Sequence, residues 1–244
     1  MSDADVARRI LRCLDLTDLS ATCSEPALDA LCRQALTPHG PVAAVCVWPQ
    51  LVVRARDLLR GSPVRIATVV NFPEGEDDLE RVSDDAEEAV GDGANEIDCV
   101  LPYRSFLRGE TGPVRDLLAA VRDMVDGGRT LKVVLETGAL PDSGAIAAAS
   151  RLAIDSGADF LKTSTGKGAP PTPEAAETML EVIRGAGRPV GLKVSGGIRT
   201  LAAARDYLDL ADRVMGEGWA TPQTFRIGAS ALYDTLVAAI EGRE

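Results

Sequence analysis

Eight short β-rich runs recur along the 244-residue chain, and segments with helical spacing separate them. One run follows the next after about 30 residues, which is the length of a repeated βα unit. The runs are Leu14–Thr17, Ala43–Trp48, Arg65–Phe72, Asn95–Pro102, Leu131–Gly138, Asp159–Gly166, Val190–Gly197 and Phe225–Ser230. Most of them are almost continuously apolar, as is typical of parallel strands that helices cover.

The segments between the runs carry signals for the starts and ends of helices. Asp77–Val90 has an apolar stripe at helical spacing, and Gly91 is its predicted C-cap. Thr172 and Thr200 are predicted N-caps of two later helices. The charged stretch at residues 1–15 predicts a short N-terminal helix rather than a signal peptide.

Eight βα units predict an α/β fold, a single (β/α)8 barrel over residues 1–244 with a short N-terminal helix. The alternative is a doubly wound open sheet, which has fewer strands and usually a glycine-rich turn after its first strand. Here the first run is followed by DLSATCSEP, which contains no glycine. The sequence therefore favours the barrel, whose chemistry lies at the carboxyl ends of its strands.

Charge and residue counts exclude several classes of function. The net charge of −11 argues against a nucleic-acid or polybasic membrane partner. No apolar run approaches the ~20 residues that span a bilayer, so we expect a soluble cytoplasmic protein, with a homodimer left open. The single histidine, His39, disfavours histidine acid–base chemistry and a zinc site. The five cysteines form no CxxC pair and are interpreted as reduced thiols.

Only four of the 26 basic residues are lysines: Lys132, Lys162, Lys167 and Lys193. A lysine can lose its proton when buried, whereas an arginine cannot. All four fall in a predicted strand or in the loop after one, and three lie inside strands, where charged side chains need partners. Lysines kept only by compositional drift would instead scatter over exposed helix faces.

Lys162 and Lys193 lie on adjacent predicted strands and would be near neighbours inside the barrel. Two ammonium groups in a low dielectric repel each other, so one of them loses its proton easily. A neutral amine can attack a carbonyl and form a Schiff base. Asp98 can exchange protons, and Asp15 can lie in the same layer. This set favours imine chemistry without a metal, although a buried ion pair between Asp98 and Lys193 would also explain these residues.

Three glycine-rich loops follow the last three runs, with the sequences STGKG, SGGIRT and GASA. Glycine lets a backbone approach an anion closely, and the late loops of such barrels often hold a phosphate. Lys167 can add a positive charge there. The alternative interpretation is that these glycines only form turns.

Six motifs spread over the chain together resemble the deoxyribose-phosphate aldolase family. They are LDLT (Leu14–Thr17), ATVVNFPEG (Ala67–Gly75), EIDCVLPYR (Glu96–Arg104), LKVVLETG (Leu131–Gly138), KTSTGK (Lys162–Lys167) and GLKVSGGIRT (Gly191–Thr200). The resemblance implies a class I aldolase on a (β/α)8 barrel that needs no cofactor and no metal. Its substrates would be 2-deoxy-D-ribose 5-phosphate in one direction, and D-glyceraldehyde 3-phosphate with acetaldehyde in the other.

The resemblance also implies a role for each matching residue. Lys162 is similar to the Schiff-base lysine, and Lys193 to the second lysine that helps it lose its proton. Asp98 is similar to the carboxylate that relays protons through water. The substrate-binding positions that match are Asp15, Thr17, Cys46, Lys132, Thr165, Gly166, Lys167, Gly196, Gly197, Gly228 and Ser230. Ala231 departs from the family pattern, since many members have a second serine there.

Two other functions stay open at this point. One is a related lysine aldolase that acts on another phosphosugar or on a keto acid. The other is a catalytically silent barrel that binds a phosphosugar; it would be favoured if Lys162 or Asp98 were missing, and both are present.

Overall fold

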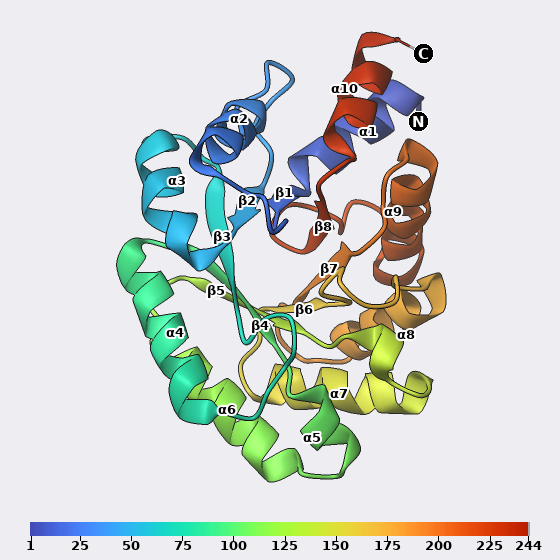
Figure 1. Ribbon diagram of the computed structural model, residues 1–244. Helices are drawn as coiled ribbons and strands as arrows, with labels where there is room; N and C mark the ends of the chain where they lie inside the picture. The colour runs from blue at the N-terminus through green and yellow to red at the C-terminus, as the bar shows by residue number, and fades with distance from the viewer. Residues whose placement is uncertain (244) are drawn as a thin grey trace.

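Eight parallel strands close into a barrel at the centre of the computed structural model, which describes residues 1–243 (Figure 1). Each strand pairs with the next in the sequence, and the eighth pairs with the first. The strands are β1 (Leu14–Asp18), β2 (Ala44–Val47), β3 (Arg65–Val70), β4 (Glu96–Val100), β5 (Thr130–Val134), β6 (Phe160–Lys162), β7 (Gly191–Ser195) and β8 (Phe225–Ala229). The predicted (β/α)8 barrel is confirmed.

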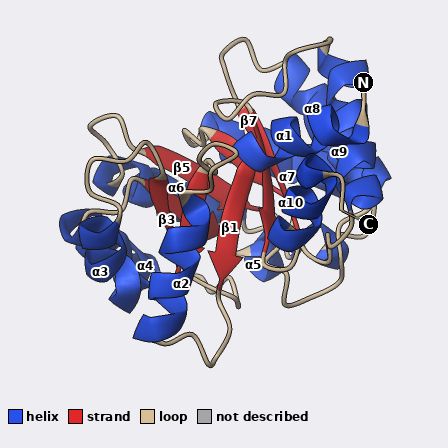
Figure 2. Ribbon diagram, turned by 90° about the horizontal axis from the view of Figure 1, so that it is seen from above, coloured by secondary structure: helices blue, strands red, loops and turns tan. Residues whose placement is uncertain are grey.

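Helices surround the strands on the outside (Figure 2). They are α1 (Asp3–Arg12), α2 (Glu25–Ala35), α3 (Val52–Leu58), α4 (Leu79–Asp92), α5 (Tyr103–Leu107), α6 (Thr111–Met124), α7 (Ser143–Asp155), α8 (Pro173–Arg184), α9 (Leu201–Met215) and α10 (Tyr233–Glu241), with short 3₁₀ turns η1 (Pro49–Leu51) and η2 (Thr137–Ala139). The predicted N-terminal helix is α1, which packs against α10 (Figure 1). No helix within residues 1–243 is long and apolar enough to cross a membrane.

The helix starts follow the predicted caps, and one helix end does not. The hydroxyls of Thr172 and Thr200 accept hydrogen bonds from the backbone N–H groups of the first turns of α8 and α9. The predicted end of α4 at Gly91 was wrong, because the helix continues to Asp92 and its C-cap is Gly93. Gly93 has φ +107°, the left-handed conformation that ends a helix, whereas Gly91 lies within the helix.

Several strands end before the apolar runs that predicted them. The run Leu131–Gly138 forms a strand only up to Val134, because Glu136 has φ +52° and the backbone leaves the extended conformation there. The run Asp159–Gly166 forms the three-residue strand β6, which ends at Lys162. The residues left over become loops at the carboxyl ends of the strands.

The apolar core has two separate parts. The larger part lies between the strands and the helices, and it includes Leu14 and Leu16 of β1. Because side chains alternate along a strand, Asp15 and Thr17 then face the barrel interior. The second part is a small apolar cluster on the interior side of β2 and β3. Its buried members are Leu19, Ala44, Cys46, Ala67 and Val69.

Candidate active site

The strand register brings the predicted lysines and Asp98 into one layer of the barrel. Lys162 on β6 is the register partner of Lys193 on β7, and Asp98 on β4 is the partner of Lys132 on β5. The residues before and after Lys132 and Lys193 on their strands belong to the outer core, so the lysines themselves point inward.

Asp98 is the common partner of all three buried lysines. Its Oδ2 accepts hydrogen bonds from Lys162 Nζ at 2.9 Å and from Lys193 Nζ at 2.7 Å. Its Oδ1 accepts a hydrogen bond from Lys132 Nζ at 2.8 Å. The exposed fractions of these four side chains are 3% or less, so the ion pairs are shielded from bulk water.

Two further ion pairs extend this cluster toward the amino ends of the strands. Lys193 Nζ lies 2.6 Å from Asp15 Oδ2, and Lys132 Nζ lies 2.6 Å from Glu96 Oε2. Arg226 on β8 joins the two carboxylates, since it donates to Asp15 Oδ1 at 2.6 Å and to Glu96 Oε1 at 2.8 Å.

Glu96 and Arg226 were missed by the sequence reasoning, although the sequence contained a usable signal. Glu96 stands two residues before Asp98, and Arg226 stands two residues before Gly228. Residues two apart on a strand share a face, so both side chains had to point into the barrel. We name the seven residues Asp15, Glu96, Asp98, Lys132, Lys162, Lys193 and Arg226 the charged cluster.

The electrostatics of the charged cluster fix the ionisation of two of its members. Burial opposes the charged form of Asp98, but the three lysines offset it and hold the pKa of this carboxyl well below its ordinary value. Burial also disfavours the ammonium of Lys193, yet Asp15 and Asp98 hold the pKa of this side chain well above its ordinary value. Lys193 is therefore held in its charged form.

Lys162 has the weakest carboxylate support of the three buried lysines. Among the described residues, its Nζ forms an ion pair with Asp98 alone, through an oxygen that Lys193 also uses. Lys132 and Lys193 each meet at least two carboxylates. Lys162 is thus the buried lysine with the fewest carboxylate partners.

A cavity of about 270 Å³ opens above Lys162 at the carboxyl ends of the strands. Ten of the predicted site residues line it, namely Thr17, Lys162, Thr165, Gly166, Lys167, Lys193, Gly196, Gly197, Gly228 and Ser230. Asp15, Asp98 and Lys132 do not line the cavity and lie beneath it, within the charged cluster. The structure therefore brings together the residues that the sequence had placed on four different strands and loops.

The three glycine-rich loops meet at this cavity. Gly166, Gly196 and Gly197 have φ values of +80°, +108° and +75°, a conformation that other residues rarely adopt. Lys167 is exposed, and its Nζ donates a hydrogen bond to the Leu19 carbonyl at 2.8 Å. This bond ties the loop after β6 to the loop after β1.

Gly228 is required for a reason other than backbone conformation. A Cβ at this position would lie 3.0 Å from Lys193 Cε and 3.0 Å from Ser195 Cβ. The missing side chain therefore leaves room for Lys193 to reach Asp98 and Asp15.

Glu136 holds the loop after β6 in place, a role that sequence reasoning did not assign. Its carboxylate is buried, and Oε2 accepts hydrogen bonds from the backbone N–H of Thr165 at 3.1 Å and from the Thr165 hydroxyl. Thr165 Oγ1 in turn accepts a hydrogen bond from the Lys167 N–H at 3.1 Å. Glu136 thus holds Thr165, which lines the cavity, without lining the cavity itself.

Cys46 is the one predicted site residue that neither lines the cavity nor joins the charged cluster. It is fully buried in the small apolar cluster of β2 and β3. Burial raises the pKa of its thiol, so the reactive thiolate is disfavoured. Cys46 thus points into the barrel, near enough to the charged cluster to feel its charges, but its packing neighbours are apolar side chains of β2 and β3.

Comparison with known proteins gives matches over nearly the whole chain. A family model for DeoC/LacD family aldolases matches residues 14–235. A deoxyribose-phosphate aldolase from Agrobacterium fabrum is 46% identical over 242 residues, which cover 98% of this chain and 93% of that protein.

Solved structures of proteins named as deoxyribose-phosphate aldolases also match nearly the whole chain. A candidate deoxyribose-phosphate aldolase from Toxoplasma gondii superposes with a TM-score of 0.89 at 27% identity, covering 99% of this chain and 96% of its own. The tetrameric deoxyribose phosphate aldolase from Aeropyrum pernix superposes with a TM-score of 0.77 at 25% identity, covering 97% and 92%. Triosephosphate isomerase from Bartonella henselae, at 14% identity and a TM-score of 0.58 over 94% and 99%, shares the fold alone.

Proposed function

We propose that this chain, which belongs to the DeoC/LacD family of aldolases, is a class I aldolase. The enzyme reversibly cleaves 2-deoxy-D-ribose 5-phosphate into D-glyceraldehyde 3-phosphate and acetaldehyde. This reaction is a step of deoxyribonucleoside catabolism. The proposal depends most on one observation. Lys162 lines the floor of the cavity and donates a hydrogen bond to Asp98 Oδ2, the same oxygen that accepts one from the charged Lys193. The family match and the 46% identical aldolase support the choice of substrate.

The first step is formation of an imine. The neutral Lys162 amine attacks C1 of the open-chain sugar aldehyde, and loss of water gives a protonated imine. The adjacent ammonium of Lys193 favours the neutral form of Lys162 before attack, because two positive charges repel in a buried site. Asp98, which stays ionised, then offers a negative charge close to the iminium.

The second step is cleavage of the C2–C3 bond. The C3 hydroxyl proton passes to a water molecule held by Asp98, the C3 oxygen becomes a carbonyl, and the bonding electrons move toward the iminium to form an enamine. D-Glyceraldehyde 3-phosphate leaves. Proton return to C2 and hydrolysis of the remaining imine release acetaldehyde and restore Lys162. Each step uses only side chains of this chain and water.

The phosphate of the sugar fits the loops on the far side of the cavity. Gly166, Gly196 and Gly197 present backbone without side chains, and Lys167 and Ser230 add a cation and a hydroxyl. Lys167 is exposed, so its pairing with phosphate is screened by salt and is weaker than that of a buried cation. The cytoplasmic location and the homodimer remain predictions from the sequence.

The test is a product assay with 2-deoxy-D-ribose 5-phosphate, in which acetaldehyde and D-glyceraldehyde 3-phosphate are quantified separately. We expect equal amounts of both products from the purified protein and none from Lys162→Met. A panel of other acceptor aldehydes, with acetaldehyde as donor, separates this function from that of a related lysine aldolase. Binding of the sugar phosphate without any product would instead identify a silent phosphosugar-binding barrel.

A further inference from the structure

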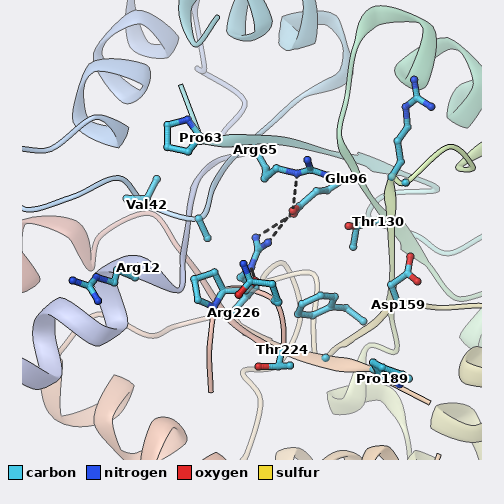
Figure 3. Close-up of a pocket in the computed structure, with 18 of the residues that line it drawn as sticks. Arg12, Val42, Pro63, Arg65, Glu96, Thr130, Asp159, Pro189, Thr224 and Arg226 are labelled. Atoms are coloured by element: carbon cyan, nitrogen blue, oxygen red, sulfur yellow. Dashed lines mark hydrogen bonds and ion pairs between the residues drawn. The ribbon is translucent and has the colours of Figure 1, made fainter. Parts of the chain in front are cut away.

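Two members of the charged cluster, Arg226 and Glu96, lie at the end of the barrel away from the substrate cavity. Both line a second cavity of about 830 Å³ at the opposite mouth of the barrel. Figure 3 shows Arg226 and Arg65 pointing toward Glu96 in the middle of that cavity. Arg226 is only 5% exposed, and its guanidinium also lies over the ring of Phe160 at 5.6 Å.

Arg226 connects to both sides of the lysine layer through two carboxylates. On one side Asp15 receives Arg226 at Oδ1 and Lys193 at Oδ2, each at 2.6 Å. On the other side Glu96 receives Arg226 at 2.8 Å and Lys132 at 2.6 Å. The planar fork of a guanidinium can hold two carboxylates at once, which an ammonium cannot do as well.

The charge balance of the cluster depends on Arg226. Its four cationic side chains face three carboxylates, so full ionisation leaves one positive charge in excess. Without Arg226 the three lysines and three carboxylates would balance while every lysine keeps its proton. With Arg226 the balance is reached when one lysine is neutral, and Lys162 is the lysine with the least carboxylate support.

The remaining ionisable groups around the cluster do not alter this count. Next to the cluster lie Cys13 beside β1, Cys46 on β2 and Arg65 on β3. The substrate cavity is also lined by Asp18, Lys167 and Arg199, which are half-buried or exposed, so water screens their charges. Burial raises the pKa of the Cys13 thiol to about 12 and also raises that of Cys46, so both stay neutral. Arg65 lies 3.7 Å from Glu96, but its side chain is 41% exposed and its charge is screened by water.

We propose that Arg226 is a positioning residue for imine formation: it holds Asp15 and Glu96 and supplies the excess positive charge that favours loss of the proton from Lys162. This inference rests on the proposed function, since it assigns a task to a residue that never touches the substrate. The second cavity also allows an experimental test, because a small cation can reach the Arg226 position through it without entering the substrate cavity.

The test measures the rate at which acetaldehyde and cyanoborohydride label Lys162 as a function of pH. The rate rises with pH and then levels off, and the midpoint of this rise reports how firmly Lys162 holds its proton. Arg226→Met removes the excess charge, so we expect the midpoint to move up by about one pH unit, which slows labelling about tenfold on the rising limb. Arg226→Lys keeps the charge and should restore the midpoint.

A second variant changes the net charge of the cluster in the opposite sense, and it distinguishes an electrostatic effect from damage to the fold. Glu96→Gln removes a carboxylate, so the midpoint should move down by a similar amount. General loosening of the barrel would shift both variants the same way. Arg129→Ala is the matched control, because Arg129 lines the same cavity and, within residues 1–243, its side chain donates its hydrogen bond to the nearby Asp126 carbonyl rather than to the charged cluster.

Guanidinium rescue is the final arm of the test. Guanidinium ion, at concentrations too low to unfold the protein, should return the midpoint of Arg226→Ala toward that of the wild type and leave Arg129→Ala unchanged. An unshifted midpoint in Arg226→Met, or the same direction of shift in Glu96→Gln, would overturn the inference. If the wild-type protein shows no labelling at all, the proposed function fails instead, so the two failures are distinguishable.

Discussion

The two halves of the barrel interior are built from opposite kinds of residues. The strands β2 and β3 contribute Ala44, Cys46, Ala67 and Val69, which pack as a small apolar cluster. The other six strands contribute the charged cluster, in which every carboxylate touches at least two cations. Both halves are buried, so burial alone does not distinguish a catalytic side of the barrel from a filled one.

The difference between the halves lies in what a single substitution would leave behind. Removing one apolar side chain from β2 or β3 leaves a small void, whose cost is local. Removing one member of the charged cluster leaves a buried charge without its partner and changes the ionisation of its neighbours. We therefore expect substitutions in the charged half to affect activity far more than substitutions in the apolar half.

The largest expected effect is that of Lys162→Met. The variant keeps the volume of the side chain and loses the amine, so kcat should fall by more than about a thousandfold. Circular dichroism should show an intact barrel, because Asp98 keeps Lys132 and Lys193 as partners. Residual activity within tenfold of the wild type would mean that another lysine forms the imine.

A smaller effect is expected for Lys193→Arg, which keeps the charge. The planar guanidinium is larger than an ammonium, and Gly228 and Ser195 leave little room around the lysine stem. We expect kcat to fall roughly a hundredfold, with imine trapping slowed but still present. A rate near that of the wild type would show that only the charge of Lys193 matters.

The phosphate end of the cavity should give a weaker effect. Lys167→Leu should lower kcat/KM for 2-deoxy-D-ribose 5-phosphate by about tenfold, because Lys167 is exposed and water screens its charge. The same variant should leave kcat/KM for non-phosphorylated 2-deoxyribose nearly unchanged, and raising the salt concentration should narrow the difference. An equal loss of kcat/KM with both sugars would mean that Lys167 only stabilises the loop, through its hydrogen bond to the Leu19 carbonyl, and does not bind the phosphate.

The smallest effect is expected in the apolar half. Cys46→Ala should change kcat/KM by less than about twofold and lower the free energy of unfolding by about 1 kcal/mol. Its sensitivity to inactivation by high acetaldehyde should match that of the wild type, because the thiol does not line the substrate cavity. Clear protection by the substitution would show that acetaldehyde reaches this half of the barrel.

The fold and the lysine layer could be predicted from the sequence because both depend on local patterns. Repeated apolar runs indicate strands, and a lysine within such a run must point inward and find a partner. Strand alternation predicts that Arg226 and Glu96 point into the barrel, but the sequence does not state the stagger between β8 and β4 that joins them in one ion pair. Cys46 could not be placed for the same reason, since its neighbours come from β3 and from Leu19.

The central claim is that Lys162 alone forms the covalent intermediate, and trapping with borohydride tests it most directly. The protein is incubated with acetaldehyde, reduced and digested, and the modified peptide is identified by mass spectrometry. We predict one added ethyl group per chain, on Lys162, with Lys132, Lys167 and Lys193 unmodified. A label found mainly on any of those three lysines, or spread evenly over all four, would contradict the account.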